Sequence, residues 1–367
     1  MEKVILYIKS KEDPSSYYRL YQYFYNIPKK KIKIAESVPT WLYRWYYDKS
    51  KRGYLEVFLL AAISIVRTLF FFLYDYFIFH AKIVVINRRF FARRCPKILG
   101  QILLLYLKKK RVIWDFDDNI ILDKEITKYE KKILQQLAEK IIVTGEYLKS
   151  TLEKEVWRKV ILLPTTDLRL EREDISDWIK RRELLYDHKI RLIWIGSRAN
   201  LPELEAILPI IERAAEKIRI ETGKQVFLYC VCNEKITETF SNIRIINILW
   251  SRERAVKCMK QSHIGLMPLK DTSYTRGKAG FKAVQYLSAG IPTIASDVGF
   301  NHKVVINGTD GFLVSETEAF KEAIIRLSTE KILWKQMAYQ GRKDWEKKFL
   351  ASKYQSFWIN LVYNTNI

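Results

Sequence analysis

A glycine-bearing segment rich in cations is the part of the sequence that most clearly indicates chemistry. Residues 276–282 read Arg-Gly-Lys-Ala-Gly-Phe-Lys, and an apolar helical pattern follows from about Phe281 to Gly290. A helix N-terminus presents unpaired backbone amides and a partial positive charge. The cations around this end are Arg276, Lys278 and Lys282. We therefore expect a diphosphate to bind here, the alternative being that the glycines only shape a turn and the cations are solvated.

A second candidate phosphate contact lies some eighty positions earlier in the chain. There Gly196, Ser197 and Arg198 follow the β-branched, apolar run Ile190–Ile195, which predicts a strand. Gly196 would let a ligand approach the backbone closely, and the Arg198 guanidinium offers two parallel donors to a phosphate. Both candidate contacts lie near strand ends of one predicted domain, so they could converge on one ligand.

Carboxylates cluster at the end of another predicted strand, Val112–Phe116. They are Asp115, Asp117 and Asp118. Ligands of parallel sheets bind at the carboxyl ends of the strands, so Asp117 and Asp118 could hold hydroxyl groups of a ligand. The alternative is that one of them caps the next helix and the others are solvated. A glycoside-hydrolase pair is less well supported, because carboxylates on one loop do not define the separation across a substrate that hydrolysis requires.

The elements that must position these residues alternate between short apolar strands and helix-length segments. The predicted strands are Val4–Ile8, Ile83–Asn87, Val112–Phe116, Ile141–Thr144 and Val160–Leu163, and then, after the charged linker Asp167–Lys189, Ile190–Ile195, Val226–Cys232, Ile243–Ile248, Ile264–Met267, Pro292–Ala295 and Phe312–Val314. Strands that are apolar on both faces and alternate with helices indicate parallel sheets covered on both sides. We predict an α/β protein with two Rossmann-like doubly wound domains, at 1–175 and 176–345, and a closing amphipathic helix at 346–367.

Several common sites are not indicated. No GxGxxG follows the first predicted strand and no GxxxxGK[ST] occurs in the sequence. The four histidines lie far apart, and the four cysteines lack metal-site spacing, so we expect no bound metal, no cofactor and no histidine-based triad. Cys95, Cys230, Cys232 and Cys258 indicate buried thiols of a reducing compartment. The first apolar run is too short for a signal peptide, so a cytoplasmic location is expected.

The most apolar stretch of the chain is Val57–Phe79. Arg67 and Asp75 interrupt it. A charge near the centre of a membrane span costs about 3 kcal/mol for insertion on the more lenient scale. We therefore predict a buried helix of a soluble domain here rather than a membrane span.

The balance of charge predicts an anionic partner. The 64 Lys and Arg residues outnumber the 41 Asp and Glu residues, which gives a formal charge of +23. Within Pro28–Arg52, basic residues interleave with Trp41, Tyr43, Trp45, Tyr46 and Tyr47. Such a segment suits an anionic membrane surface and a lipid-borne partner, the alternative being that these aromatic rings pack inward. Nucleic acid is the less favoured partner, because no helix-turn-helix, zinc-finger or RNA-recognition signature is present.

At the level of motifs, the second half of the chain resembles the nucleotide-binding domain of family 4 glycosyltransferases with the GT-B fold. The residues that carry this resemblance run from Ile264 to Leu269, then through Arg276-Gly277-Lys278, Gly280-Phe281-Lys282-Ala283, Gln285-Tyr286, Gly290-Ile291-Pro292, Ala295-Ser296, Gly299 and Gly308 to Gly311-Phe312-Leu313. Weaker matches in the first half are Tyr18-Arg19, Ile86-Asn87-Arg88-Arg89, Asp115-Phe116-Asp117-Asp118 and Leu163-Pro164-Thr165-Thr166.

This resemblance implies two domains that face each other across a cleft and a metal-independent, retaining transfer of a hexose from a nucleoside diphosphate sugar to an acceptor hydroxyl. The departing phosphate would serve as the base. Arg198, Lys278 and the amides near Gly280 would neutralise the diphosphate, as catalytic groups. The expected substrate contacts are Asp117, Asp118, Gly196, Ser197, Arg276, Gly280, Phe281, Lys282 and Gln285. The implied role is assembly of a cell-surface polysaccharide or glycoconjugate, by a cytoplasmic enzyme held peripherally at the inner face of the membrane.

The sequence departs from the family pattern at two positions. That pattern has two glutamates eight positions apart, for the donor sugar and the ribose, where this chain has Gly277 and Gln285. The Gln285 amide can still bond ribose hydroxyls, but Gly277 cannot replace a carboxylate. Either Lys278, Asp271 or an aspartate of the first domain contacts the sugar, or the chain is a binding relative with weakened catalysis.

Overall fold

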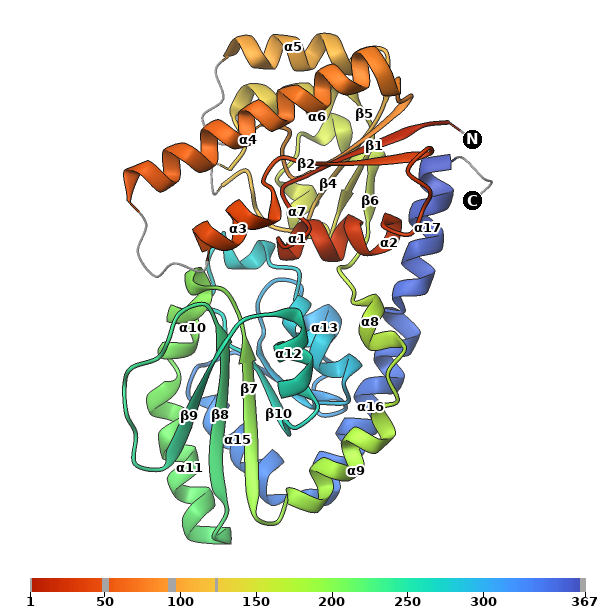
Figure 1. Cartoon of the computed structure of the whole chain (residues 1–367). Coiled ribbons are helices and arrows are strands. Elements are labelled where there is room, and N and C mark those ends of the chain that lie inside the picture. The colour runs from red at the N-terminus through yellow and green to blue at the C-terminus, as the bar shows by residue number, and fades with distance from the viewer. Residues whose placement is uncertain (1, 48–52, 92–96, 123–124, 364–367) are drawn as a thin grey trace. The chain divides into compact units, whose positions relative to one another are not determined.

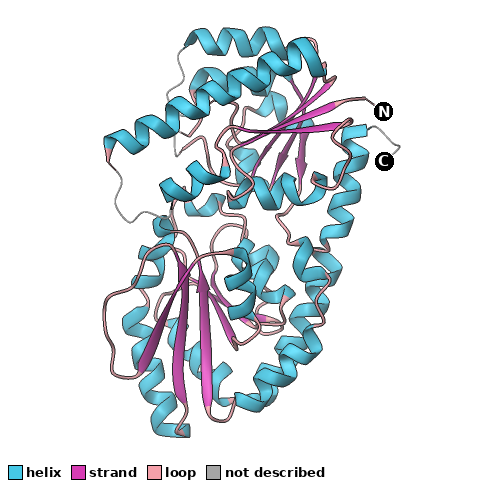
Figure 2. Ribbon diagram, viewed as in Figure 1, coloured by secondary structure: helices cyan, strands magenta, loops and turns pink. Residues whose placement is uncertain are grey.

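The computed structural model describes residues 2–47, 53–91, 97–122 and 125–363. They form two compact units, each an α/β domain with one parallel sheet between helices (Figures 1 and 2). The first unit comprises residues 1–166, 277–279 and 351–367, and the second comprises 167–276 and 280–350. The short segment Gly277–Ala279 thus belongs to the first unit although its neighbours in sequence belong to the second.

The first unit has a six-stranded sheet in the order β2-β1-β3-β4-β5-β6. Its strands are β1 (Val4–Ile8), β2 (Ile32–Glu36), β3 (Ile83–Asn87), β4 (Arg111–Phe116), β5 (Ala138–Val143) and β6 (Val160–Leu162). Its α-helices are α1 (Pro14–Ser16), α2 (Gln22–Phe24), α3 (Thr40–Tyr47), α4 (Tyr54–Tyr74), α5 (Lys97–Leu107), α6 (Lys128–Leu137), α7 (Glu146–Ser150) and α17 (Ala351–Tyr363). A π-helical turn, Asp75–Phe79, continues α4.

The second unit also has a six-stranded sheet, in the order β12-β11-β10-β7-β8-β9. Its strands are β7 (Lys189–Ile195), β8 (Gln225–Cys232), β9 (Ile243–Leu249), β10 (Ile264–Met267), β11 (Thr293–Ser296) and β12 (Gly311–Val314). Its α-helices are α8 (Leu168–Glu171), α9 (Ile175–Leu185), α10 (Leu201–Glu205), α11 (Leu208–Thr222), α12 (Arg252–Met259), α13 (Phe281–Ser288), α14 (Asn301–Val304), α15 (Ala319–Thr329) and α16 (Lys331–Lys348). The central strands are buried on both faces, which explains their continuous apolar runs.

The fold prediction of two Rossmann-like doubly wound domains is confirmed, and each predicted strand is present within a few residues of its predicted bounds. One strand was missed. β2 is an edge strand paired only with β1, and its sequence Ile-Lys-Ile-Ala-Glu carries the charges of a half-exposed strand. It lies within Pro28–Arg52, of which residues 48–52 are outside the described part of the chain.

The segment Asp167–Lys189 is not a linker, so that interpretation is wrong. It contains α8 and α9, and Ile175, Trp178 and Ile179 belong to the buried core of the second unit. These apolar side chains recur at helical intervals between charged residues. The average composition of the segment is therefore charged, although one face of the helix is apolar. At the other end of the chain, the predicted closing helix corresponds to α17 in the first unit.

The prediction that Val57–Phe79 is a buried core helix is also wrong. Tyr54–Phe79 is the one stretch among the described residues that is long and apolar enough to cross a membrane, and only 17% of its most apolar window is buried. In Figure 1 the helix α4 runs along the outside of its unit. In the aromatic segment before it, Trp41 and Trp45 are exposed, while Tyr43, Tyr46 and Tyr47 are partly buried.

The prediction of buried thiols is confirmed where the structure describes the cysteines, and the reducing compartment stays a prediction. Cys230, Cys232 and Cys258 are free and buried, and burial raises the pKa of each thiol. Cys95 lies outside the described residues.

Candidate functional site

The site in the second unit is organised by a hydrogen bond between α13 and β7. The hydroxyl of Tyr286, in α13, accepts the backbone N–H of Ile195 at 2.9 Å. Tyr286 is completely buried, and Gly265 of β10 makes this possible, because a Cβ on Gly265 would lie 2.4 Å from the tyrosine ring. The end of β7 and the helix α13 are therefore held together, and with them the two predicted phosphate contacts.

Gly196 and Lys282 meet at the ring of Trp194. A Cβ on Gly196 would lie 2.3 Å from the indole, so only glycine fits there with the ring in place. The Lys282 ammonium lies 5.4 Å from the centre of the same ring, within the range of a cation–π contact. The structure thus brings together a cation from α13 and the open backbone that follows β7.

Arg198 also lies at this edge of the sheet and has a carboxylate partner. Its Nε is 3.0 Å from Oε2 of Glu234, a residue that follows β8. Both side chains are about one-third exposed. Beside it, the Ser197 hydroxyl accepts the side-chain amide of Asn200 at 3.0 Å. An incoming phosphate would compete with Glu234 for the guanidinium.

The N-terminus of α13 is shaped by Gly280. This glycine has φ 64°, in the left-handed region that favours glycine, and a Cβ there would approach Val304 at 3.0 Å. Phe281 is the first residue of α13, and the first amides of any α-helix lack partners within that helix. This end of α13 is suited to an anion for that reason.

Arg276 is less favourably placed as a phosphate ligand. It lies on an exposed loop and donates from Nε and Nη2 to the two carboxylate oxygens of Asp271, at 2.6 and 2.8 Å. This bond lowers the pKa of Asp271. The loop also passes close to Gly299, where a Cβ would lie 2.6 Å from the Arg276 carbonyl oxygen. Arg276 therefore has a bidentate partner within its own loop.

Gln285 is buried and is bonded to a carboxylate that the sequence did not connect with it. Its side-chain amide donates to Asp167 Oδ2 at 2.9 Å. Asp167 also caps α8 by accepting the Arg169 N–H, and burial raises its pKa in spite of these bonds. The Gln285 side-chain amide and the Asp167 carboxylate form one polar pair on the second unit.

In the first unit, the predicted aspartates surround an arginine. Arg88 Nε lies 3.2 Å from Asp117 Oδ1, and the same oxygen accepts the Ser15 hydroxyl at 2.5 Å. Arg88 also donates to Asp118 and, at 3.3 Å, to Glu125. Burial alone would lower the pKa of this guanidinium, but the carboxylates outweigh it and raise the pKa. For Asp117, burial is the larger effect and raises the pKa against the attraction of Arg88.

A second arginine, buried beneath the same edge of the sheet, binds the remaining aspartate. Arg19 is completely buried and donates to Asp115 Oδ1 from Nη2 at 2.5 Å. Asp115 also accepts the side-chain amide of Asn87 at 3.0 Å. Asp115 is therefore a structural ligand of Arg19, whereas Asp117 and Asp118 are the carboxylates nearer the surface.

Two further residues on which the sequence analysis depended, Gly277 and Lys278, belong to the first unit. Lys278 Nζ lies 3.9 Å from Asp118 Oδ1. A Cβ on Gly277 would lie 2.9 Å from Asn119 Cβ and 3.0 Å from Leu148 Cδ2. A larger side chain at position 277 would require Asn119 and Leu148 to shift, which is consistent with the departure from the glutamate of the family pattern.

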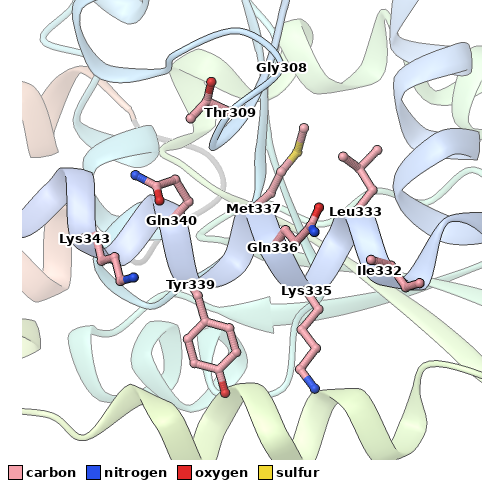
Figure 3. Close-up of a pocket in the computed structure, with 10 residues that line it drawn as sticks. All are labelled: Gly308, Thr309, Ile332, Leu333, Lys335, Gln336, Met337, Tyr339, Gln340 and Lys343. Carbon is pink, nitrogen blue, oxygen red and sulfur yellow. The ribbon is translucent and has the colours of Figure 1, made fainter.

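A pocket of about 600 Å³ lies elsewhere on the second unit, and none of the predicted site residues lines it. Figure 3 shows Gly308 and Thr309 on one side of α16, while Lys335 and Tyr339 project from the other. Lys335 Nζ donates to Glu183 in α9 at 2.8 Å. The pocket is an open surface hollow along α16.

A family comparison identifies the second unit. Residues 189–330 match the family model described as glycosyl transferases group 1. These residues form a group 1 glycosyl transferase domain. The match spans β7 to α15 and includes Gly196, Arg198, Lys282 and Gln285. No curated protein sequence matches the chain.

Solved structures resemble the whole chain, including the half that precedes the glycosyl transferase domain. HepE of Anabaena in complex with UDP has a TM-score of 0.63 at 9% identity, over 98% of this chain and 99% of that one. Sucrose-phosphate synthase of Thermosynechococcus elongatus has 0.62 at 14% identity, with the same coverage. A glycosyltransferase of Rickettsia africae has 0.64 at 12% identity, over 99% of this chain and 98% of that one. At such identities the likeness shows the fold, which is GT-B.

Three polar residues of the candidate site were missed by motif reasoning. Arg88 was visible only as part of a weak match, although it follows β3 directly. Asp167 was assigned to a linker, and Glu234 follows β8 of the glycosyl transferase domain. All three lie just after a strand or at a helix cap, and this position is the signal that could have found them.

Proposed function

We propose that this protein is a glycosyltransferase that moves a hexose from a nucleoside diphosphate sugar to an acceptor hydroxyl with retention of anomeric configuration. The observation that supports it best is the connection of the end of β7 to α13, made by the Ile195–Tyr286 hydrogen bond and the Lys282–Trp194 contact, within a group 1 glycosyl transferase domain. The donor diphosphate is the ligand whose charge suits both elements.

The diphosphate is bound by Arg198, Lys282 and the first amides of α13, next to Gly280 and Phe281. Arg198 exchanges Glu234 for phosphate oxygens, and charge-assisted bonds of this kind are among the strongest available to a side chain. Lys278 adds positive charge where the leaving diphosphate becomes more negative. The fixed charges and dipoles of these groups stabilise the departing nucleoside diphosphate.

The remaining polar pairs bind the hydroxyl-rich parts of the substrates. The side-chain carbonyl oxygen of Gln285 and the Asp167 carboxylate accept hydrogen bonds from ribose hydroxyls. Asp117 and Asp118, oriented by Arg88, accept hydroxyls of the sugar or the acceptor and replace the carboxylate that Gly277 cannot supply.

The transfer step balances without a dedicated protein base. The bond from the anomeric carbon to the diphosphate oxygen breaks, and the acceptor oxygen bonds to the same carbon on the same face. The acceptor proton passes to the departing phosphate. The chain's side chains hold and neutralise the diphosphate in this step, without a metal or another cofactor in our proposal.

In the cell, we place this reaction at the inner face of the cytoplasmic membrane, in assembly of a polysaccharide or glycoconjugate on a lipid-linked acceptor. The formal charge of +23 favours an anionic surface. UDP is the first nucleotide to test, because HepE, which shares the fold, was solved with UDP.

Calorimetric titration of the protein with UDP, GDP, ADP and their sugars, with and without a chelator, tests the donor site. We expect one nucleotide to bind with a dissociation constant on the order of micromolar, unaffected by chelator, and binding to be lost in Arg198→Ala. Arg213→Ala is the matched control, since Arg213 forms an exposed ion pair with Glu318 in the same unit. Nuclear magnetic resonance of the product anomer tests retention, and no binding of any nucleotide would contradict the proposal.

A second candidate is a binding relative with weakened catalysis. The observation that favours it is the tight packing at Gly277, where a Cβ would lie 2.9 Å from Asn119 Cβ. Tight nucleotide-sugar binding with no consumption of the donor, over a panel of lipid-linked and soluble acceptors, would support this candidate instead.

A further inference from the structure

The helix α4 and its π-helical continuation expose many large apolar side chains. The buried side chains are Ser64, Thr68, Phe71, Asp75 and Phe79, three of them polar, while Leu69, Phe72 and Tyr74 are partly buried and pack against the core. The apolar side chains more than half exposed are Leu55, Phe58, Val66, Phe70, Tyr76, Phe77 and Ile78, together with Tyr54. The exposed face of a helix in a water-soluble domain is normally polar.

The two charges that interrupt this apolar run are both turned toward the protein. Arg67 Nε donates to the Glu36 carbonyl oxygen of β2 at 3.0 Å. Asp75 is completely buried and accepts from Tyr106 at 2.7 Å and from Lys110 at 2.6 Å. The exposed side of α4 could therefore contact lipid acyl chains without burying the charge of Arg67 or Asp75 in them.

The neighbouring helix α5 also exposes apolar side chains. The Phe72 ring of α4 lies 5.0 Å from the Tyr106 ring of α5, and the two helices run beside each other in Figure 1. Ile98 and Leu105 of α5 are each about two-thirds exposed. We call the outward side chains of Tyr54–Phe79 together with Ile98 and Leu105 the α4–α5 surface.

Lysines lie near α4 and after α5. Lys33 Nζ lies 4.8 Å from the centre of the partly buried Tyr74 ring, and Lys3 Nζ lies 5.3 Å from that of the buried Phe79. Lys108 and Lys109, which follow α5, are exposed. An apolar face with lysines nearby suits insertion at the boundary between acyl chains and anionic headgroups. A second copy of this chain would instead bring like charges together.

We propose that the α4–α5 surface inserts into the surface of an anionic membrane, with α4 lying in the plane of the bilayer. A spanning orientation would expose Ser64, Thr68 and Asp75 to lipid and would separate Asp75 from Tyr106 and Lys110. This inference specifies the membrane contact assumed in the proposed function. It rests on that function for its purpose, but vesicle binding can be measured without turnover.

Flotation of the full chain with vesicles tests the surface directly. The vesicles contain phosphatidylcholine alone or equal parts of phosphatidylcholine and phosphatidylglycerol. We expect binding to the anionic vesicles, and partitioning weaker by roughly a hundredfold or more in the triple variant Phe70→Gln, Leu73→Gln, Phe77→Gln. The matched control replaces three exposed apolar residues of the second unit with glutamine, Leu184, Ile220 and Ile332, and should bind as the wild type does.

Single variants test whether weaker vesicle binding by the triple variant results from a failure to fold. Phe70→Gln and Leu73→Gln should each weaken partitioning by about tenfold while the thermal unfolding midpoint is retained. Equal binding by wild type and triple variant, or no vesicle binding by the wild type, would overturn the inference. So would a wild-type dimer that the triple variant converts to monomer in analytical ultracentrifugation.

Nucleotide titration of the same preparations keeps the two proposals distinct. A triple variant that binds nucleotide but not vesicles would locate the membrane contact on the α4–α5 surface. A wild type that binds vesicles but no nucleotide would contradict the glycosyltransferase proposal and leave the membrane contact standing.

Discussion

Arg88 and Asp117 form an ion pair at the carboxyl edge of the first sheet, with Arg88 Nε 3.2 Å from Asp117 Oδ1. The backbone of Arg88 has φ 61°, a conformation uncommon outside glycine. It is held there from both sides, because its N–H donates to the Asp115 carbonyl oxygen and its own carbonyl oxygen accepts the Trp114 indole N–H. Residues fixed in such conformations occur often at functional sites.

The first prediction is that Arg88→Met lowers the free energy of unfolding by about 3 kcal/mol, because it leaves Asp117, Asp118 and Glu125 close together without their shared cation. Urea unfolding followed by circular dichroism measures this. The control Arg213→Met breaks an exposed pair and should cost about 0–1 kcal/mol. Equal losses in the two variants would mean that the Arg88 cluster behaves as an ordinary surface network.

Glu130 gives a prediction about pH. This buried carboxyl accepts the backbone N–H groups of Phe90 and Phe91, yet burial raises its pKa to about 7. The folded protein therefore holds the proton more tightly than the unfolded chain, so the free energy of unfolding falls as the pH rises from about 4.5 to 7.

Glu130→Gln should remove this dependence, because the amide oxygen can accept the same two bonds without a charge. At pH 8 we expect the variant to be more stable than the wild type by up to about 3 kcal/mol, with little difference at pH 4. Thermal unfolding across this range tests it. Glu216→Gln, at an exposed position, is the control and should leave the pH profile unchanged; parallel profiles for wild type and Glu130→Gln would contradict the prediction.

The bond between Gln285 and Asp167 predicts an exchange experiment. Gln285→Glu places two carboxylates within hydrogen-bonding distance in a buried place and should destabilise the protein by about 1–3 kcal/mol. Asp167→Asn in the same chain restores a donor and an acceptor, and asparagine can still cap α8. We expect the double variant to recover most of the stability, and additive losses in a double-mutant cycle would refute the pairing.

Tyr286 should affect nucleotide binding without touching the nucleotide. Tyr286→Phe leaves the buried N–H of Ile195 without its acceptor, at a cost of about 1–3 kcal/mol, and loosens the connection of β7 to α13. We expect weaker UDP binding by calorimetry together with a lower unfolding midpoint. Tyr229→Phe, at a partly buried tyrosine of the adjacent strand β8, is the control; unchanged UDP affinity in Tyr286→Phe would show that this bond does not position the site.

The sequence was sufficient for the sheets because their central strands are buried on both faces and therefore apolar throughout. It did not predict β2, whose edge position allows charged residues. The orientation of α4 was not predictable either, since hydropathy averages around the helix and does not show that Ser64 and Thr68 face inward. In the site, Gly196 and Lys282 were predicted from their positions at strand and helix ends. The partnership of Arg88 with Asp117 depends on contacts between residues far apart in sequence, which spacing alone does not contain.

Gly277 offers the last prediction, because it tests whether the missing carboxylate can be restored. Glutamate at this position requires a Cβ that would lie 2.9 Å from Asn119 Cβ and 3.0 Å from Leu148 Cδ2. Gly277→Glu should therefore destabilise the protein by about 1–3 kcal/mol and should not raise donor turnover. The control is Gly277→Glu with Leu148→Ala, in which the truncated side chain removes the Leu148 contact, but not the Asn119 contact, at the cost of a core cavity. If turnover rises in either variant, position 277 can supply the sugar contact, and the role we propose for Asp117 and Asp118 is contradicted.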